Sequence, residues 1–168
     1  ACQAVIGFIR LIALDIFGRR SAPGDLPPLR TAVLMPVYNE NPVGIAAAVR
    51  AMADGLAERS PGSFDFFLLS DTSAPEAWVH EEAVFTALID AAPKGCPVYY
   101  RHRRDNRERK AGNIADWVSR WGGAYEAMIL LDADSLIAPD TMIEMSRRLA
   151  AEPGLGLIQT LPGIVDRK

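Results

Sequence analysis

Residues 31–42 read TAVLMPVYNENP, and this stretch predicts how the chain folds. Its first seven residues form a short apolar run, which indicates a strand buried on both faces. Asn41 followed by Pro42 is typical of a helix start, with asparagine as the N-cap and proline at the first helical position. A buried strand that leads directly into a helix favours a parallel sheet with helical crossovers.

The rest of the chain repeats this alternation of strands and helices. Further apolar runs predict strands at residues 64–70, 98–100, 127–131 and 155–158. Apolar side chains at helical spacing define the helices between them. These positions are Ile45, Val49, Met52 and Leu56; Val84, Phe85, Leu88 and Ile89; Ile114, Trp117, Val118 and Trp121; and Met142, Met145 and Leu149. The pattern predicts an α/β fold, a mostly parallel sheet with helices on both faces, in which ligands bind beyond the carboxyl ends of the strands.

The first thirty residues differ from this pattern. Residues 1–17 are apolar and Arg19-Arg20 follow them, which predicts a membrane-proximal apolar helix over residues 1–20 with a basic flank on the cytoplasmic side. The tail of a transmembrane helix, an interfacial helix and an ordinary buried helix remain alternatives. Residues 21–30 (SAPGDLPPLR) are typical of a linker. The formal net charge of −3 gives no reason to expect nucleic-acid binding.

An acidic pair, Asp132 and Asp134, follows the predicted strand at residues 127–131. In an extended backbone, residues two apart point the same way, so both carboxylates would face the ligand edge of the sheet. Mg²⁺ or Mn²⁺ is often held by one or two carboxylates together with substrate phosphates. We therefore expect a divalent cation here; the alternative is that Asp134 or Ser135 only caps the next helix.

Polar residues also follow the first two strands. Asp71 comes directly after residues 64–70, and the capping-box spacing of Ser73 and Glu76 would leave its carboxylate free to accept hydrogen bonds from a base or ribose. After residues 31–37, Asn41 supplies the helix cap. Tyr38 is then available to cover a ring and Glu40 to bind polar groups, although plain surface packing of Tyr38 is the alternative.

Residues 101–110, RHRRDNRERK, form a strongly basic segment. Most of these side chains are expected to be a solvated charged loop, and RNA binding is less favoured because no aromatic residues are interleaved with the basic ones. Lys110 differs from the others because it enters the next helix with Ala111-Gly112-Asn113. A lysine at a helix N-terminus suits a diphosphate.

These motifs together resemble the family-2 glycosyltransferases of GT-A fold. The resemblance rests on Pro36-Val37-Tyr38-Asn39-Glu40, Ser70-Asp71, Lys110-Ala111-Gly112-Asn113 and Asp132-Ala133-Asp134, in that order at the predicted strand ends, and spans about residues 31–159. Longer stretches, LSDT at residues 69–72, RERKAGNI at 107–114 and LDADS at 131–135, resemble the glucans biosynthesis glucosyltransferase H group most closely. That group consists of multi-pass inner-membrane enzymes of Gram-negative bacteria, with UDP-glucose as donor.

The resemblance implies a role for each matching residue. Pro36, Tyr38, Glu40 and Asp71 would line the uridine site, and Lys110 would lie near the diphosphate. Asp132 and Asp134 would bind UDP and the divalent cation. Residues 31–168 would be the donor-binding part of an inverting hexosyltransferase that adds glucose to a growing periplasmic glucan, on the cytoplasmic side of the inner membrane and with lipid around flanking helices. The catalytic base is expected on a later segment, so this stretch alone would be inactive.

Two other functions fit some of these features. A phosphotransferase of the haloacid-dehalogenase type would use Asp132 as its nucleophile, but that class carries its acidic pair on the first strand and not the fourth. A non-catalytic nucleotide-binding module on a membrane protein would need the same pocket without turnover. No GxGxxG, GxxxxGK[ST] or GxSxG motif is present, which disfavours NAD sites, P-loops and serine hydrolases.

Overall fold

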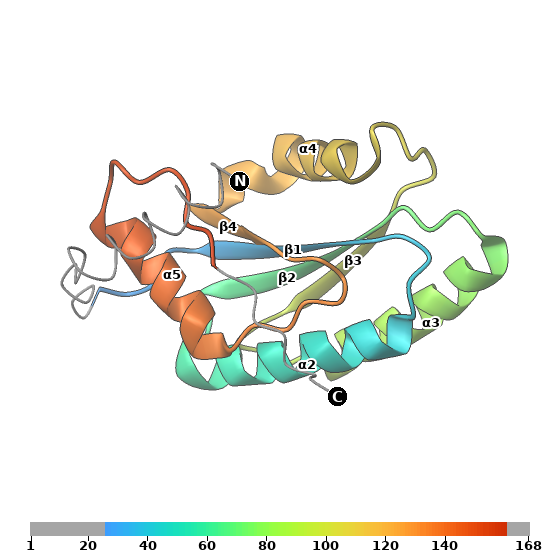
Figure 1. Ribbon diagram of the computed structural model, residues 1–168. Helices are drawn as coiled ribbons and strands as arrows, with labels where there is room; N and C mark the ends of the chain where they lie inside the picture. Colours follow the sequence, from blue (N-terminus) through green and yellow to red (C-terminus); the bar gives the residue numbers. More distant parts are fainter. Residues whose placement is uncertain (1–25, 161–168) are drawn as a thin grey trace, which may run out of the picture.

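A computed structural model of the chain describes residues 26–160. Strands and helices alternate along this part of the chain, as Figure 1 shows. The elements are β1 (Thr31–Val37), α2 (Pro42–Arg59), β2 (Phe64–Ser70), α3 (Pro75–Ala91), β3 (Val98–His102), α4 (Arg109–Trp121), a 3₁₀ turn η1 (Gly122–Ala124), β4 (Ala127–Leu130) and α5 (Pro139–Ala151). The α/β class predicted from the sequence is confirmed.

Over the described residues, the sheet has four parallel strands in the order β3-β2-β1-β4. The carboxyl ends of β2 and β4 therefore lie at the same edge of the sheet, as expected for Asp71 and Asp132. The two strands are not neighbours, however, because β1 pairs with both of them. The sequence also predicts that Asp71 and Asp132 end adjacent strands at this edge, and that prediction is wrong, because β1 lies between them.

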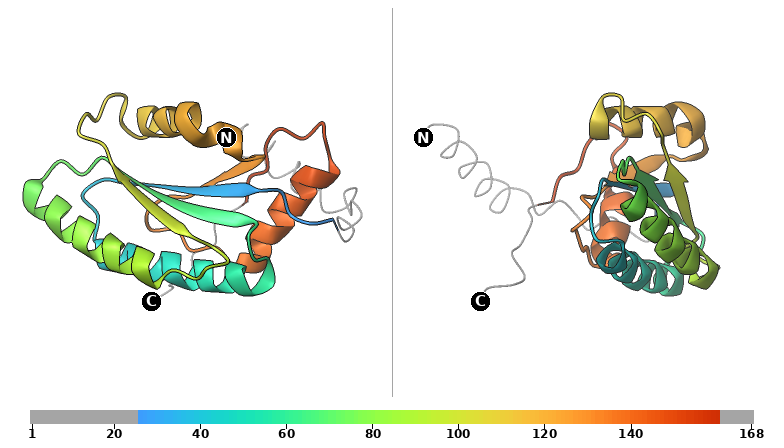
Figure 2. Two further views of the ribbon diagram at one scale, coloured as in Figure 1. Left: turned by 180° about the vertical axis from the view of Figure 1, so that it is seen from behind. Right: turned by 90° about the vertical axis from the view of Figure 1, so that its right-hand side faces the viewer.

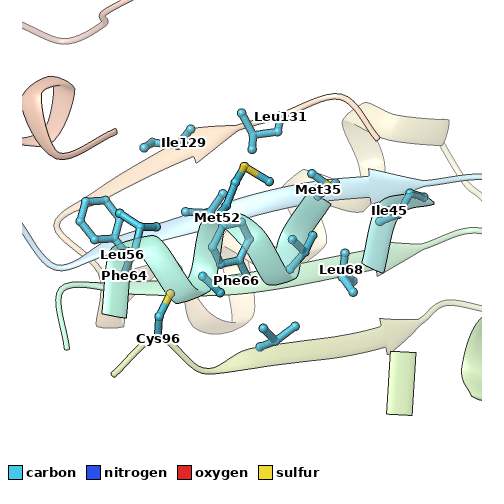
Figure 3. Close-up of a cluster of buried hydrophobic side chains, with 14 of the residues drawn as sticks. Met35, Ile45, Met52, Leu56, Phe64, Phe66, Leu68, Cys96, Ile129 and Leu131 are labelled. Atoms are coloured by element: carbon cyan, nitrogen blue, oxygen red, sulfur yellow. The ribbon is translucent and has the colours of Figure 1, made fainter. Parts of the chain in front are cut away.

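Helices cover both faces of the sheet. Figures 1 and 2 show α4 on one face and α2, α3 and α5 on the other. The larger core lies on the second face, where α2 places Ile45, Met52 and Leu56 over Met35 and Phe66 (Figure 3). On the α4 face, a smaller cluster forms around the fully buried Trp117.

The predicted apolar helix faces are confirmed for α2 and hold only in part for the others. In α4, Trp117 is buried and Ile114 packs on the core, but Val118 and Trp121 are 43% and 41% exposed. Ile89 in α3 is also partly exposed, while Phe85 and Leu88 are buried. Among residues 26–160, a single helix crosses the α4 face, so the residues at the flanks of its apolar stripe have no second helix in this part of the chain to pack against.

The helix starts differ in how their caps form. Asn41 caps α2 as predicted, and its side-chain oxygen accepts a hydrogen bond from the amide of Val43 at 3.0 Å. The capping box predicted for α3 is absent: the N-cap is Ala74 and no side chain caps it. Pro75 begins α3 instead, because its missing N–H and fixed φ suit the first helical position.

The strand predicted at residues 155–158 is not formed, and this stretch is irregular in the structure. It lines a small groove beside β4 together with Met128 and Ile129. Four residues that include Gly156 make a weak strand signal, because a short apolar run does not distinguish strand from coil. Residues 1–20, the predicted apolar helix, and most of the linker lie outside the described residues. Among residues 26–160, no helix is long and apolar enough to span a bilayer.

Candidate functional site

A pocket of about 640 Å³ lies at the carboxyl edge of the sheet. It is lined by Pro36, Val37, Tyr38, Glu40, Asp71, Asn106, Arg109, Lys110, Asp132, Ala133 and Asp134. All the site residues singled out from the sequence are therefore brought together. The sequence reasoning missed two polar members of this lining, Asn106 and Arg109.

The position of the pocket follows from the strand order. The chain builds β1, β2 and β3 in one direction, then crosses over to place β4 on the other side of β1. The order of the strands therefore reverses at β1, and the pocket is a crevice between the loops that follow β1 and β4. Ligands of open α/β sheets bind at such a switch point. Residues 36–40 and 132–134 form the two sides of this crevice.

Asp132 and Asp134 lie in a turn after β4 and not on an extended strand. The strand ends at Leu130, and the amide of Ser135 donates to the carbonyl oxygen of Asp132 at 2.9 Å. Both aspartates nonetheless line the pocket. The capping alternative is wrong, because α5 begins at Pro139 and no side chain caps it.

The Asp132 carboxylate accepts a hydrogen bond from the ammonium group of Lys110, which pairs the end of β4 with the start of α4. The Asp134 carboxylate is exposed, and within residues 26–160 it has no hydrogen-bond partner or ion pair. Of these two aspartates, Asp132 is already paired with Lys110, and Asp134 has no partner among the described residues.

Two carboxylates fit a divalent cation only if the ligand supplies further oxygens. Over the described residues, no group of three or more His, Cys, Asp or Glu side chains could hold a metal ion. Mg²⁺ is commonly bound by one or two carboxylates together with waters and substrate phosphates. Asp132 and Asp134 match that incomplete set, so the donor chemistry fits a cation that arrives with a diphosphate.

Asp71 is not free, contrary to our expectation. Its carboxylate is 5% exposed and accepts two hydrogen bonds from the guanidinium group of Arg103, Nε to Oδ1 at 2.8 Å and Nη2 to Oδ2 at 3.0 Å. Hydrogen bonding to Asp71 in turn raises the pKa of Arg103. Each carboxylate oxygen has a second lone pair, so Asp71 can still accept a hydrogen bond from a ligand in the pocket.

The loop after β1 is held by a chain of hydrogen bonds from α3. Asn39 has a φ of 57° and its amide donates to the Thr72 hydroxyl at 3.0 Å. That hydroxyl donates to the buried carboxylate of Glu81 at 2.6 Å. Glu40 accepts a hydrogen bond from the amide of Tyr38, so both residues of the pocket wall are oriented by a left-handed Asn39 between them.

Alternation along β3 separates the basic segment into two faces. Tyr100 and His102 point toward α3, where the Tyr100 hydroxyl donates to Glu81 and His102 stacks on Trp78. Burial first, and then the neighbouring Glu81 carboxylate, raises the pKa of Tyr100. Arg101, on the opposite face with Arg103, points toward α4. The prediction of a solvated loop is therefore wrong for Arg101 and Arg103, which pair with Asp116 and Asp71, while Lys110, for which the sequence predicts a separate role, pairs with Asp132.

Arg101 and Asn113 attach the body of α4 to the sheet. Arg101 donates to Asp116 and to the side-chain oxygen of Asn113, while the Asn113 amide group donates to the carbonyl oxygen of Leu69 at 2.9 Å. Hydrogen bonding from Arg120 and the nearby charge of Arg101 lower the pKa of Asp116. The helix that carries Lys110 is thus connected directly to β2.

Comparisons with known proteins agree with the fold and the motifs. The model of glycosyl transferase family 2 matches residues 32–166. Two proteins called glucans biosynthesis glucosyltransferase H are similar over 98% of this chain: one from Vibrio cholerae is 45% identical over 170 residues, and one from Caulobacter vibrioides is 46% identical over 169. The chain covers only 24% and 25% of these relatives, about a quarter of their length.

A solved structure is similar in fold. It is a mannosyltransferase from Pyrobaculum calidifontis in complex with GDP-Man and Mn²⁺, with a TM-score of 0.60 and 21% sequence identity. The likeness covers 91% of this chain and 43% of that one, and it supports the GT-A fold. With the family match over most of the chain and the motifs gathered at one sheet edge, the chain belongs to glycosyl transferase family 2.

Proposed function

We propose that this chain is the donor-binding part of a glucosyltransferase that uses UDP-glucose and a divalent cation to extend a periplasmic glucan. The observation that carries the proposal is the pocket itself, which joins Asp71, Lys110 and the Asp132–Asp134 turn at the switch point of the sheet. The curated relatives named for glucan biosynthesis support the choice of glucose and of a glucan acceptor.

Each side of the pocket suits one part of the donor. On the β1–β2 side, Tyr38 is 50% exposed and can cover a base, and the Asp71 carboxylate can accept from the N–H group of that base. Pro36 and Glu40 complete this uridine side. On the α4 side, Lys110 and Arg109 bring positive charge to the first turn of a helix, where a diphosphate is favoured.

Asp132 and Asp134 would hold the divalent cation. When bound, such an ion offsets the negative charge that develops on the leaving diphosphate. The chain's own contribution is to orient the donor: Asp71 fixes the base, Lys110 places a second positive charge at the leaving group, and the pocket leaves the sugar accessible to the acceptor. An acceptor hydroxyl would lose its proton to a base outside the described residues, and its oxygen would form the new bond to the anomeric carbon as the bond to UDP breaks. A single displacement of this kind inverts that carbon.

The setting of the intact protein is also part of the proposal. We place this domain on the cytoplasmic side of a bacterial inner membrane, with the apolar residues 1–17 and their basic flank next to the lipid. UDP-glucose would be the donor, a glucan the acceptor and membrane lipid the third partner, with no nucleic acid. By itself, the stretch of chain described above would bind the donor without completing the transfer.

Thermal unfolding of the intact protein with a panel of nucleotide-sugars tests the proposal. With Mn²⁺ present, UDP-glucose and UDP should raise the melting temperature more than GDP-mannose or ADP-glucose do. At about a hundred times Kd, a ligand that binds only the folded state stabilises it by about 2.7 kcal/mol. Lack of protection by every nucleotide-sugar would refute the proposal. Trapping of Asp132 as a beryllium fluoride adduct would favour a phosphotransferase instead.

A further inference from the structure

Arg103 lies outside the pocket, and its side chain links the residue after β2 to the turn that leads into α4. The guanidinium group of Arg103 binds both oxygens of Asp71, and its Nη2 also donates to the backbone carbonyl oxygens of Arg107 at 3.0 Å and Arg109 at 3.3 Å. Asp71 follows β2, whereas the two carbonyl groups belong to the turn that leads into α4 and Lys110. Arg103 therefore joins the base side of the pocket to its phosphate side.

Arg103 is placed to support the pocket and not to touch a ligand in it. It is not among the residues that line the pocket, and its side chain is only 16% exposed. Its backbone amide donates to the carbonyl oxygen of Ser70 at 2.9 Å, which extends the pairing of β3 with β2 by one residue. The guanidinium group is thus anchored on the sheet, directly behind Asp71.

The turn that Arg103 reaches needs such support. Glu108 and Arg109 have φ values of 55° and 51°, in the left-handed region that residues with a side chain rarely adopt. Two consecutive left-handed residues persist only where surrounding contacts stabilise them. The carbonyl groups on either side of Glu108 accept from Arg103, and this supplies the contact.

We propose that Arg103 is a positioning residue that fixes Asp71 and the residue 107–109 turn relative to one another, so that base and diphosphate are recognised by one rigid site. This inference rests on the proposed function of the pocket. Lysine could not replace Arg103, because a single ammonium group cannot bind both Asp71 oxygens and still reach two carbonyl groups. Without the guanidinium group, Lys110 would lose its fixed position relative to the base.

Calorimetric titration of the intact protein with UDP in Mn²⁺ tests this coupling. The Lys110→Met change is made in three backgrounds: the parent, Arg103→Lys, and the control Arg104→Lys, which alters an exposed neighbouring arginine. In the parent and in the control, Lys110→Met should weaken UDP binding about tenfold, which corresponds to one charge-assisted contact. In Arg103→Lys, the same change should weaken it by about twofold or less, because Lys110 is already misplaced.

Uridine, which has no phosphate, supplies the second readout. Its affinity should fall about fivefold or more in Arg103→Lys, stay within about twofold of the parent in Arg104→Lys, and be unaffected by Lys110→Met. If Arg103 only stabilised the fold, Arg103→Lys would lower the melting temperature and leave the effect of Lys110→Met on UDP binding unchanged. If Arg103→Lys does not fold, Asp71→Asn breaks the same connection from its other end and should also reduce the effect of Lys110→Met.

Two outcomes overturn the inference in distinguishable ways. A full tenfold effect of Lys110→Met in the Arg103→Lys background would show that the two sides of the pocket are positioned independently, with the proposed function left intact. Failure of the parent protein to bind UDP at all would refute the proposed function, and the inference with it.

Discussion

The ammonium group of Lys110 lies against the carboxylate of Asp132, so the first turn of α4 is bound to the turn after β4 across the pocket. Both side chains are substantially exposed, at 46% and 71%, so water screens this ion pair. The Lys110 ammonium group occupies a carboxylate oxygen of Asp132 that a divalent cation would need. If Asp132 binds the proposed cation, Lys110 and that cation would compete for its carboxylate until a diphosphate is present to accept the lysine.

This competition predicts that Lys110→Met changes the affinity for Mn²⁺ and the affinity for UDP in opposite directions. In Lys110→Met, affinity for Mn²⁺ without nucleotide should rise about two- to fivefold, the range expected for loss of an exposed ion pair. Affinity for UDP with Mn²⁺ present should fall, because the diphosphate loses a positive charge. Titration of Mn²⁺ followed by electron paramagnetic resonance, and calorimetry with UDP, give the two values. A fall in both affinities would show that Lys110 does not oppose metal binding.

Asp134 should carry most of the coupling between metal and nucleotide. Since two carboxylates leave a divalent cation incompletely coordinated, UDP affinity should rise with Mn²⁺, and Mn²⁺ affinity should rise with UDP by the same factor. Asp134→Asn should remove most of that factor while the melting temperature stays unchanged, because the side chain is exposed and has no partner among the described residues. Asp90→Asn, an exposed acid on α3, is the matched control. UDP binding of equal strength in chelator would contradict the metal assignment.

The fold was predictable where strands are buried on both faces. The predicted bounds of the strands at residues 31–37 and 64–70 agree with β1 and β2, because these two strands are central and their side chains pack on helices on either side. At the edge of the sheet the prediction was less exact. The strand predicted at residues 127–131 ends one residue earlier, at Leu130, and residues 155–158 form no strand. Strand pairing at the edge depends on neighbouring segments, which a local sequence pattern does not contain.

The residues of the site could be predicted from the sequence, but the hydrogen bonds and ion pairs between them could not. Parallel strands bring the loops after them to one edge, so Asp71, Lys110 and Asp132 could be expected in one place. Composition could not show which of several arginines binds Asp71. Alternation along β3 was the usable signal, since Arg101 and Arg103 share the face of the strand that points toward α4.

Burial of Cys96 predicts that the protein loses stability at alkaline pH. Burial first, and then the charge of Asp65, raises the pKa of this thiol from 9.0 to about 12. Between those values the unfolded thiol loses a proton that the folded one keeps, so the free energy of unfolding falls as pH rises, by up to about 1.4 kcal/mol per pH unit. Below pH 9 the Cys96 thiol is protonated in both the folded and the unfolded state, and its full contribution to the free energy of unfolding is present.

Urea unfolding from pH 8 to pH 11 measures this effect. The raised pKa values of Tyr100 and Tyr125 act in the same direction above pH 10, so the comparison of interest is with Cys96→Ala. The free-energy difference between the parent and this variant should shrink as pH rises above 9. A difference that stays constant to pH 11 would show that the thiol does not titrate on unfolding.

Gly112 should prove essential for the turn that carries Lys110. A Cβ atom at this position would lie 2.2 Å from the carbonyl oxygen of Arg107 and 2.8 Å from the Cβ of Glu108, closer than atoms can approach. Because the first clash is with backbone, Gly112→Ala must displace the left-handed turn, at a cost of about 1–3 kcal/mol. Displacement of the turn should also weaken UDP binding, since Arg109 belongs to the turn and Lys110 follows it directly. Gly44→Ala in α2 is the matched control, because an added Cβ at this position meets no atom within 4 Å. This variant should stabilise the fold by about 0.5–1 kcal/mol. Urea unfolding and UDP calorimetry on both variants separate the two effects, and a Gly112→Ala protein with parental stability and UDP affinity would show that the turn tolerates a side chain at this position.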